Sequence, residues 1–567
     1  MWRLPRKAYF QLFGFRLVST PTTDKPQWEK YEQQQQQQTA HPIIFNVPAL
    51  SRVVGRDVEI LSLWQNLLAG RRFQAITGPD GIGKSTIAAE FCDRARRSER
   101  FTCIHWFNAK DDLQSTLLQF FQSMKGRKEK DVLLVIDGVQ DPQEVLRLIP
   151  EHTNVYTLLT TVSEVDSSNK IGVLKVLPLS PSAVLEFPHV LEVEDESSPA
   201  REVMHAVGYV PLLMHMVCCL MESETVTPMK LKEELHAKGF TGEGILSISS
   251  LLDVLLNIAL AALEQDCPGG KEYLAKLALF NIDNISYTLV DCLLGEGEGE
   301  VFAVQAAGLG ICEQRWDEAS LRIHPSIAKI LRSKADSASV EESAKVLHSL
   351  WPRRWRGTGS SIANELVLHT RAICETVDKL QLKYSDDLLQ CLDRSATFLA
   401  LNEGKELVTA AELWLRVVRS NQENGKKDAE TVRHARECGR LLHFLRDDRA
   451  GKVLQYAFNL ACAVHGEQSI ERALILGCYA PYMHATEDAV CLLRDAAALL
   501  ENRVSSVESV LGKEEERMLS ESVFVLLLRE GQMLQELGKA VPEVLWTMLQ
   551  QQEERIKKGR QLTPSRK

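Results

Sequence analysis

The chain has 567 residues, 45% of them hydrophobic and 25% charged, so it is long enough for about two to four domains. This composition excludes wholesale disorder and a collagen-like fibre. The 66 basic and 76 acidic residues give a net charge of −10, which argues against binding to nucleic acids or anionic membranes. The 13 cysteines include no CxxC pair, which is typical of reduced thiols inside a cell.

The N-terminal segment differs from the rest of the chain. Residues 1–23 contain basic and aromatic side chains but no acidic residue, which suits either a mitochondrial targeting peptide or a basic tail. A glutamine run at 33–38 indicates a linker, so we expect a disordered tail over 1–45. No transmembrane segment is expected, because the longest uncharged apolar stretch, 205–221, is too short for a bilayer. The predicted location is intracellular and cytoplasmic, with the mitochondrion as the alternative.

A glycine-rich segment follows the first predicted strand of the globular part. The apolar stretch 73–77 predicts a buried strand, and a helical segment follows at 87–91. The residues between them match GxxxxGK[ST], whose glycines, amide groups and helix N-terminus bind phosphates. The alternative is a glycine-rich turn with a solvated lysine. The residues expected to contact a nucleotide in this loop are Gly78, Gly81, Ile82, Gly83, Lys84, Ser85 and Thr86.

Two of these side chains have specific predicted roles. Lys84 would neutralise the terminal phosphates of the nucleotide, and the Ser85 hydroxyl would hold Mg²⁺. A later apolar run, 132–137, ends in Asp137. An acid in this position after such a loop is expected within reach of the Mg²⁺ shell, although it could instead cap a turn. Lys84 and Asp137 are therefore the candidate catalytic residues, and Ser85 and Asp137 the candidate metal ligands.

Further strands are predicted at 101–107 and 155–159. Thr160 and Thr161 end the later strand, where their hydroxyls could sense a terminal phosphate or cap the strand. Strands that alternate with helices at this spacing predict a doubly wound parallel α/β domain. A nucleotide would lie across the carboxyl ends of its strands.

The order of the motifs resembles the NB-ARC family, a branch of the STAND class of P-loop NTPases. The resemblance covers roughly residues 46–335. It implies ATP or ADP with Mg²⁺ as ligands, an adenine base enclosed by Val54, Gly55, Arg56 and Pro211, and His324 at the β-phosphate of ADP. Besides the P-loop, the segments that carry it are Val54-Gly55-Arg56, Leu133–Val139, Leu159-Thr160-Thr161, Leu177–Ser180, Gly208–Leu213 and Ile323-His324-Pro325.

Two positions depart from the family pattern. Gly138 stands where the family usually has a second acid that polarises water, and Val162 stands where it has an arginine. Phosphoryl transfer needs such groups beyond positioning, so the sequence predicts nucleotide binding with slow or absent hydrolysis. Asp141 could partly substitute for the missing acid, and other residues of the fold could supply either role.

The resemblance also divides the chain into domains. It implies a nucleotide-binding domain (46–180), a helical ARC-type subdomain (181–245) and a winged-helix domain (246–335). In the last of these, two short strands at 308–312 and 321–323 are expected on either side of a polar tip. The recognition region lacks a basic cluster, so no nucleic-acid binding is expected.

The remaining sequence, 336–560, contains almost no strand signal, and 561–567 is expected to be a tail. Apolar residues recur there at helical spacing, with small residues where paired helices would pack. This pattern favours a TPR-like α-solenoid, with a plain helical bundle as the alternative. Such a solenoid would bind a protein or peptide partner.

The functional prediction is a regulatory switch or signalling scaffold in which the bound nucleotide controls partner binding by the helical repeats. Family resemblance implies a possible homo-oligomer on activation. Two alternatives stay open: an active ATPase that does conformational work, and an interaction scaffold with a vestigial nucleotide site.

Overall fold

The computed structural model describes most of the chain, and it divides the chain into two compact units, one ending at Ala335 and the other containing Asp336–Lys567. Of the predicted tails, 1–45 and 561–567, residues 1–42 with the glutamine run and residues 562–567 lie outside the described residues. These residues are 43–45, 47–48, 53–98, 100–109, 131–149, 154–165, 171–184, 199–223, 226–240, 247–316, 318–352, 358–401, 406–506 and 513–561, with isolated positions between 113 and 121.

The first unit contains a six-stranded sheet in the order β1-β3-β4-β5-β2-β6, and every neighbouring pair is parallel. Strand β2 is buried along its whole length, and so are the first five residues of β4, because a parallel sheet is covered on both faces. Residues 43–45, which were expected to belong to the tail, form strand β1 and pair with β3. The strands are β1 Ile43–Phe45, β2 Phe73–Thr77, β3 Cys103–Asn108, β4 Val132–Val139, β5 Val155–Thr161 and β6 Ile171–Lys175.

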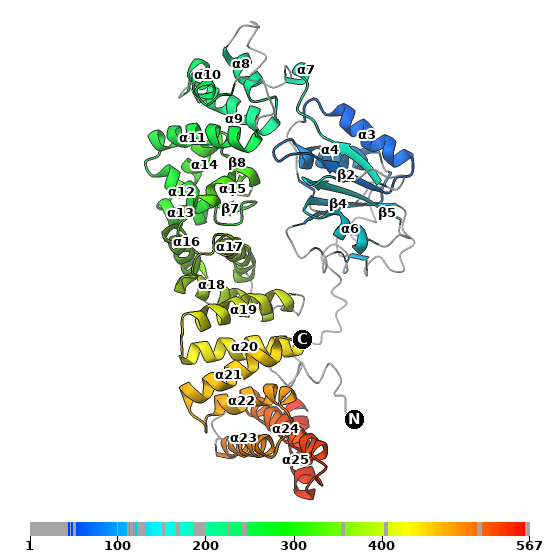
Figure 1. The fold of residues 1–567 in the computed structure, drawn as a ribbon, viewed down its shortest axis with the longest axis vertical. Coiled ribbons are helices and arrows are strands. Elements are labelled where there is room, and N and C mark those ends of the chain that lie inside the picture. Colours follow the sequence, from blue (N-terminus) through cyan, green and yellow to red (C-terminus); the bar gives the residue numbers. More distant parts are fainter. Residues whose placement is uncertain are drawn as a thin grey trace. The chain divides into compact units, whose positions relative to one another are not determined.

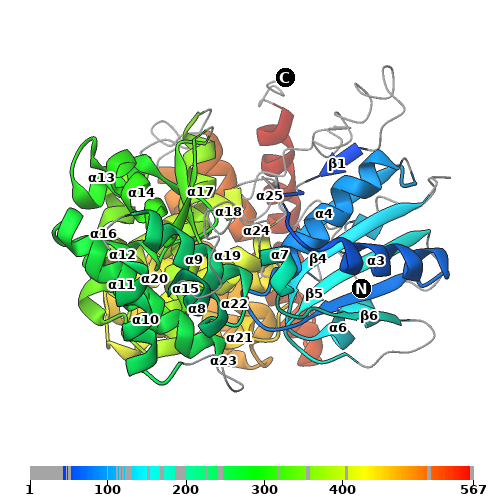
Figure 2. The same ribbon diagram turned by 90° about the horizontal axis from the view of Figure 1, so that it is seen from above.

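Helices cover both faces of this sheet, as the predicted doubly wound arrangement requires (Figure 2). On one face, Leu134 and Ile136 of β4 form a core with Val145 of α6 (Pro142–Leu148). Helix α4 (Lys84–Arg97) contributes no residue to that core and packs on β2, β4 and β5, while α3 (Asp57–Leu68) packs on α4 and β6. Side chains of a strand alternate between faces, so one strand supplies both cores.

Residues 181–335 are mainly helical and include a second, three-stranded sheet of order β7-β9-β8. The predicted strand at 308–312 was wrong: helix α14 continues to Gly308, and the strand begins at Cys312. The alanines and the glycine at the end of α14 are compatible with helical backbone, so the helix includes Gly308. The elements are α7 Pro181–Val184, α8 Pro199–Ala206, α9 Pro211–Glu222, α10 Pro228–Ala237, α11 Ile248–Asp266, α12 Gly270–Leu277, β7 Ile285–Ser286, α13 Tyr287–Leu294, α14 Glu298–Gly308, β8 Cys312–Arg315, β9 Ser320–Ile323 and α15 Pro325–Ser333.

Within the described residues, one helix, α11, is long and apolar enough to cross a membrane by length and composition. Its apolar window is 44% buried, and the helix packs against α9, α12 and α15. A core helix meets the same criterion, so this is weak support for a membrane span. Asp253 interrupts the apolar sequence of α11, so the helix is not an uncharged stretch.

The second unit is an array of helices, each packed on the next along the chain (Figure 1). Contacts also join α20 to α22 and α22 to α24, which is the pattern of stacked helix pairs rather than of a closed bundle. A Cβ at Gly439 would lie 2.6 Å from Leu454 Cδ2, so a small residue is required where α20 meets α21. The helices are α16 Ser337–Leu350, α17 Thr358–Leu380, α18 Asp386–Leu401, α19 Leu407–Glu423, α20 Ala429–Leu445, α21 Ala450–His465, α22 Ile470–Tyr479, η1 Ala480–Tyr482, α23 Glu487–Ser506, α24 Lys513–Glu536 and α25 Glu543–Gln561.

Candidate nucleotide-binding site

The glycine-rich loop joins β2 to the N-terminus of α4, in the strand–loop–helix context that phosphate binding requires. Gly83 is the N-cap residue of α4 and has a φ of 95°, and no side chain caps this end of the helix. The first amide groups of a helix have no partner within it and carry the positive end of its dipole. Thr86 lies in this first turn. The loop backbone can therefore receive an anion.

Lys84 lies at the start of α4, and its side chain is only 10% exposed. Its Nζ donates a hydrogen bond to Pro79 O (2.8 Å) and lies 3.8 Å from Asp80 Oδ1. Burial lowers the pKa of the Lys84 ammonium, whereas the carboxylates of Asp80 and Asp137 raise it. Lys84 is thus an ammonium held inside the loop by short-range contacts with oxygen atoms.

Ser85, Asp137 and Thr160 meet at the carboxyl ends of the strands. Ser85 Oγ and Thr160 Oγ1 both donate to Asp137 Oδ1, at 2.7 and 2.5 Å, and Thr160 Oγ1 accepts from Gly138 N at 2.9 Å. Strand β5 lies between β4 and β2 in the sheet, which brings Thr160 between Asp137 and the loop. The Ser85 hydroxyl and the Asp137 carboxylate are hard oxygen donors, so these residues fit Mg²⁺.

The structure also accounts for the residues around Asp137. Pairing of β4 with β5 shifts register between Ile136 and Val139, and Gly138 within this irregularity has a φ of 80°. A left-handed backbone favours glycine there. Asp141, which was considered as a substitute acid, accepts a hydrogen bond from Gln143 N (2.9 Å) and caps α6.

The residues at the end of β5 and directly after it have different roles. Thr161 Oγ1 accepts a hydrogen bond from Ser163 N at 3.0 Å, as expected for a hydroxyl that caps the end of a strand. Val162, in the position of the family's arginine, is 56% exposed. Among the described residues of this segment, Thr160 is the one joined to Asp137.

The Arg56 side chain is buried against the phosphate loop and does not face solvent. Arg56 is 5% exposed, and its guanidinium donates to Ile82 O (2.8 Å), Leu177 O (2.9 Å) and Glu59 Oε1 (2.6 Å). It therefore holds the phosphate loop against the segment that follows β6. The neighbouring Gly55 lies against α7, where a Cβ would come within 2.3 Å of Ala183 Cβ. Val54 precedes this contact, and an adenine contact for Val54, Gly55 and Arg56 stays a prediction.

Helix α9 places its N-terminus against the loop. Pro211 is its first residue, as expected for proline at a helix start. Leu212 N donates to Gly81 O at 3.3 Å, and a Cβ on Gly83 would lie 4.0 Å from Pro211 Cγ. The structure thus brings Pro211 to the phosphate loop, 128 positions later in the chain than Gly83 by their residue numbers.

Substitution of Gly81 tests this packing. Gly81 has a φ of 79°, and a Cβ there would lie 2.9 Å from Leu212 Cδ2 and 3.0 Å from Leu212 Cβ. We expect Gly81→Ala to lower the free energy of unfolding by about 1–3 kcal/mol, because it combines backbone strain with overpacking. Thermal unfolding measures this change. An unchanged midpoint would show that α9 does not press on the loop.

His324 has a structural contact of its own. It is the N-cap of α15, and its Nδ1 accepts a hydrogen bond from Ser326 N at 3.2 Å. A helix cap is a sufficient reason for a polar residue before Pro325. The predicted contact between His324 and the β-phosphate of ADP stays a prediction.

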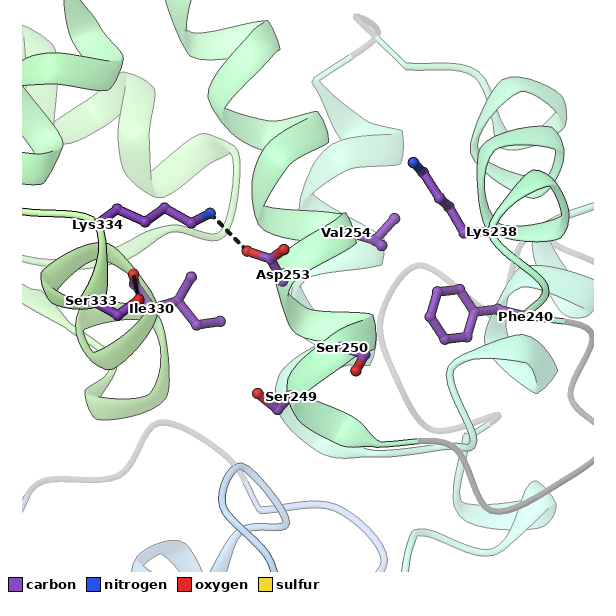
Figure 3. Close-up of a pocket in the computed structure, with 9 residues that line it drawn as sticks. All are labelled: Lys238, Phe240, Ser249, Ser250, Asp253, Val254, Ile330, Ser333 and Lys334. Carbon is purple, nitrogen blue, oxygen red and sulfur yellow. Dashed lines mark hydrogen bonds and ion pairs between the residues drawn. The ribbon is translucent and has the colours of Figure 1, made fainter.

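A separate hollow of about 520 Å³ lies among α10, α11 and α15 (Figure 3). Lys334 and Asp253 form an ion pair of 2.8 Å at its edge. None of the residues that line it belongs to the predicted nucleotide site, so it does not extend the phosphate loop. The described residues contain no group of three or more His, Cys, Asp or Glu that could hold a metal.

Sequence reasoning identified the loop and Asp137 but missed three participants. Asp80 occupies a position that the motif leaves open to any residue, Leu212 contacts the loop only through the tertiary fold, and Glu59 lies outside every motif. A carboxylate inside a phosphate loop is a visible signal that would have pointed to Asp80.

No protein-family model matches the sequence, and no curated protein matches it. Among solved structures, the chain is similar to a Signal Transduction ATPase with Numerous Domains (STAND) protein with a tetratricopeptide repeat sensor from Pyrococcus horikoshii. That match has 12% identity and a TM-score of 0.34, and covers 91% of this chain and 97% of the other. A second match is BtubC (BKLC) from P. vanneervenii, with 19% identity, a TM-score of 0.26, and coverage of 40% and 83%. Because both TM-scores are low, the function is argued from the geometry of the site.

Proposed function

We propose that the protein is a nucleotide-controlled regulatory switch of the STAND class, related to the NB-ARC family. The observation that carries the proposal is the loop from β2 to α4, where buried Lys84 and uncapped helix amides face the same end of the sheet as Ser85 and Asp137. Polyphosphate binding is the chemistry that such a loop performs. Adenine as the base follows from the family resemblance.

The residues around the loop would bind different parts of the Mg²⁺–nucleotide complex. Lys84 and the amides of Gly78, Gly81, Ile82, Gly83 and Thr86 would hold the phosphates of ATP or ADP. Ser85 and Asp137 would hold Mg²⁺, which offsets phosphate charge when bound. Thr160 orients the Asp137 carboxylate through its hydrogen bond of 2.5 Å.

Hydrolysis is expected to be slow, because the described residues next to Asp137 include no second carboxylate placed for water activation. Gly138 has no side chain, and Asp141 is engaged at the start of α6. The rival function is an active ATPase, which would require another residue to orient water. Steady-state turnover of the purified chain separates the two.

Gly138→Asp is the specific test of this explanation. A Cβ at Gly138 would meet nothing within 4 Å, so there is room for a carboxylate, and aspartate tolerates a left-handed backbone better than most residues. We expect ATP turnover to rise by roughly 10-fold or more, in line with the contribution of a positioned acid or base. Phosphate release at saturating ATP measures it.

Gly138→Asn is the matched control, because asparagine places the same shape on the same backbone without the charge. It should leave turnover at the wild-type level. Equal turnover in both variants, with nucleotide binding intact, would remove the missing acid as the reason for slow hydrolysis.

The other regions would couple the bound nucleotide to the binding of a partner. We propose that residues 181–335 comprise the ARC-type subdomain and winged helix, in which His324 would sense ADP, and that the array α16–α25 binds a protein or peptide partner. The order helix, strand, two helices and hairpin from α12 to β9 supports the winged helix. Homo-oligomerisation on activation and an intracellular location, cytoplasmic or mitochondrial, belong to the same proposal.

Nucleotide-dependent stabilisation tests the proposed function as a whole. A ligand at 100 times its dissociation constant should add about 2.7 kcal/mol to the free energy of unfolding, so thermal unfolding with ADP or ATP plus Mg²⁺ should shift upward. No shift with either nucleotide would favour a scaffold with a vestigial site.

A further inference from the structure

The phosphate loop contains a carboxylate next to its own lysine. Asp80 is the third residue of the loop, and its Oδ1 lies 3.8 Å from Lys84 Nζ. The Asp80 side chain is 55% exposed, whereas that of Lys84 is 10% exposed. The Asp80 carboxylate is therefore open to solvent, whereas most of the Lys84 side chain is covered.

Lys84 has two acidic neighbours. Asp80 and Asp137 are the two groups whose charges act on its ammonium. Asp137 is occupied by the hydroxyls of Ser85 and Thr160, but Asp80 has no such donors among the described contacts. Position 162, which follows the two threonines, is an uncharged valine. Lys84 is thus the ammonium on which both carboxylates act.

We propose that Asp80 selects between nucleotides: its carboxylate competes with the terminal phosphate for Lys84 and disfavours a nucleoside triphosphate relative to a diphosphate. The inference rests on the proposed function. The loop lysine reaches the β- and γ-phosphates, so the added phosphoryl group of a triphosphate brings more negative charge to the same ammonium. Like charges in a partly desolvated loop repel more strongly than in bulk water.

The size of the effect follows from Coulomb's law. One additional unit charge about 6 Å from Asp80, at an effective dielectric constant of about 40, changes an affinity by about tenfold. Salt screens exposed charges, and Mg²⁺ neutralises part of the phosphate charge. The preference for diphosphate is therefore expected to be largest at low ionic strength without Mg²⁺.

Calorimetric titration of the full chain with ADP and with ATP, at low salt with and without Mg²⁺, tests the inference. We expect Asp80→Asn to tighten ATP binding about tenfold more than it tightens ADP binding, because the substitution keeps the shape and removes the charge. Asp80→Glu keeps the charge and should retain the wild-type ratio of the two affinities. This rescue separates a charge effect from a change in loop structure.

Asp93→Asn is the matched control. Asp93 lies on the same helix as Lys84, and its carboxylate is paired with Arg96 and Arg97. Nine residues of helix place it about 14 Å from Lys84, so its charge acts on a bound nucleotide much more weakly than that of Asp80. It should leave both affinities unchanged. If ADP and ATP bind but Asp80→Asn does not change their ratio, this inference is rejected and the proposed function stands. If neither nucleotide binds the wild-type chain, both are rejected.

Discussion

Replacement of Lys84 by alanine is expected to abolish the stabilisation by ADP and by ATP. The ammonium is buried in the loop and is the cation closest to the phosphate site among the described contacts. Without it, phosphate charge would face Asp80 and Asp137 directly. At nucleotide concentrations 100-fold above the wild-type dissociation constant, the variant should lose the whole stabilisation of about 2.7 kcal/mol, measured as the difference in thermal midpoint with and without ligand.

Lys230→Ala is a suitable control for this variant, because it removes the same charge from an exposed position on α10. It should keep the full ligand-dependent shift. If Lys84→Ala is stabilised by nucleotide as the wild type is, binding takes place elsewhere on the chain, and the loop from β2 to α4 is not the nucleotide site.

Replacement of Arg56 by methionine is expected to have the largest effect on stability. Arg56 is 5% exposed, and its guanidinium donates to the carbonyl groups of Ile82 and Leu177 and to the carboxylate of Glu59. Methionine would fill a similar volume but leave these acceptors without their donor. Such losses cost about 2–4 kcal/mol in total, which corresponds to a midpoint lower by roughly 5–10 °C.

Arg94→Met provides the comparison, because Arg94 pairs with Glu90 and Asp57 on the helix surface. Exposed pairs contribute about 0–1 kcal/mol, so its midpoint should change little. Arg56→Met should also weaken nucleotide binding, since Ile82 is part of the phosphate loop. Equal midpoints for the two variants would contradict the role given to Arg56 as the anchor of the loop.

The nucleotide domain could be predicted closely from the sequence. Strand 73–77 was predicted with its exact ends because an apolar run stops at a glycine-rich loop. Strand 132–137 was also predicted, although β4 continues to Val139 through a backbone irregularity at Gly138. The residues of the motif are consecutive in the sequence, and their glycine conformations and lysine charge determine the local geometry. They can therefore be recognised without knowledge of the tertiary fold.

Contacts between distant segments could not be predicted in the same way. Arg56 bonds to the carbonyl groups of Ile82 and Leu177. Every residue has such a group, so no sequence motif points to these contacts. Asp141 looked available for chemistry until its hydrogen bond from Gln143 showed it capping a helix. The strand predicted at 308–312 failed because small residues permit both a helix end and a strand start.

The most direct test of the account is calorimetric titration of the full chain with ADP and Mg²⁺. The account predicts saturable binding with one site per chain, lost in Lys84→Ala and retained in Lys230→Ala. Absence of saturable binding to the wild-type chain, or the same binding to Lys84→Ala, would contradict the claim that this loop holds a nucleotide.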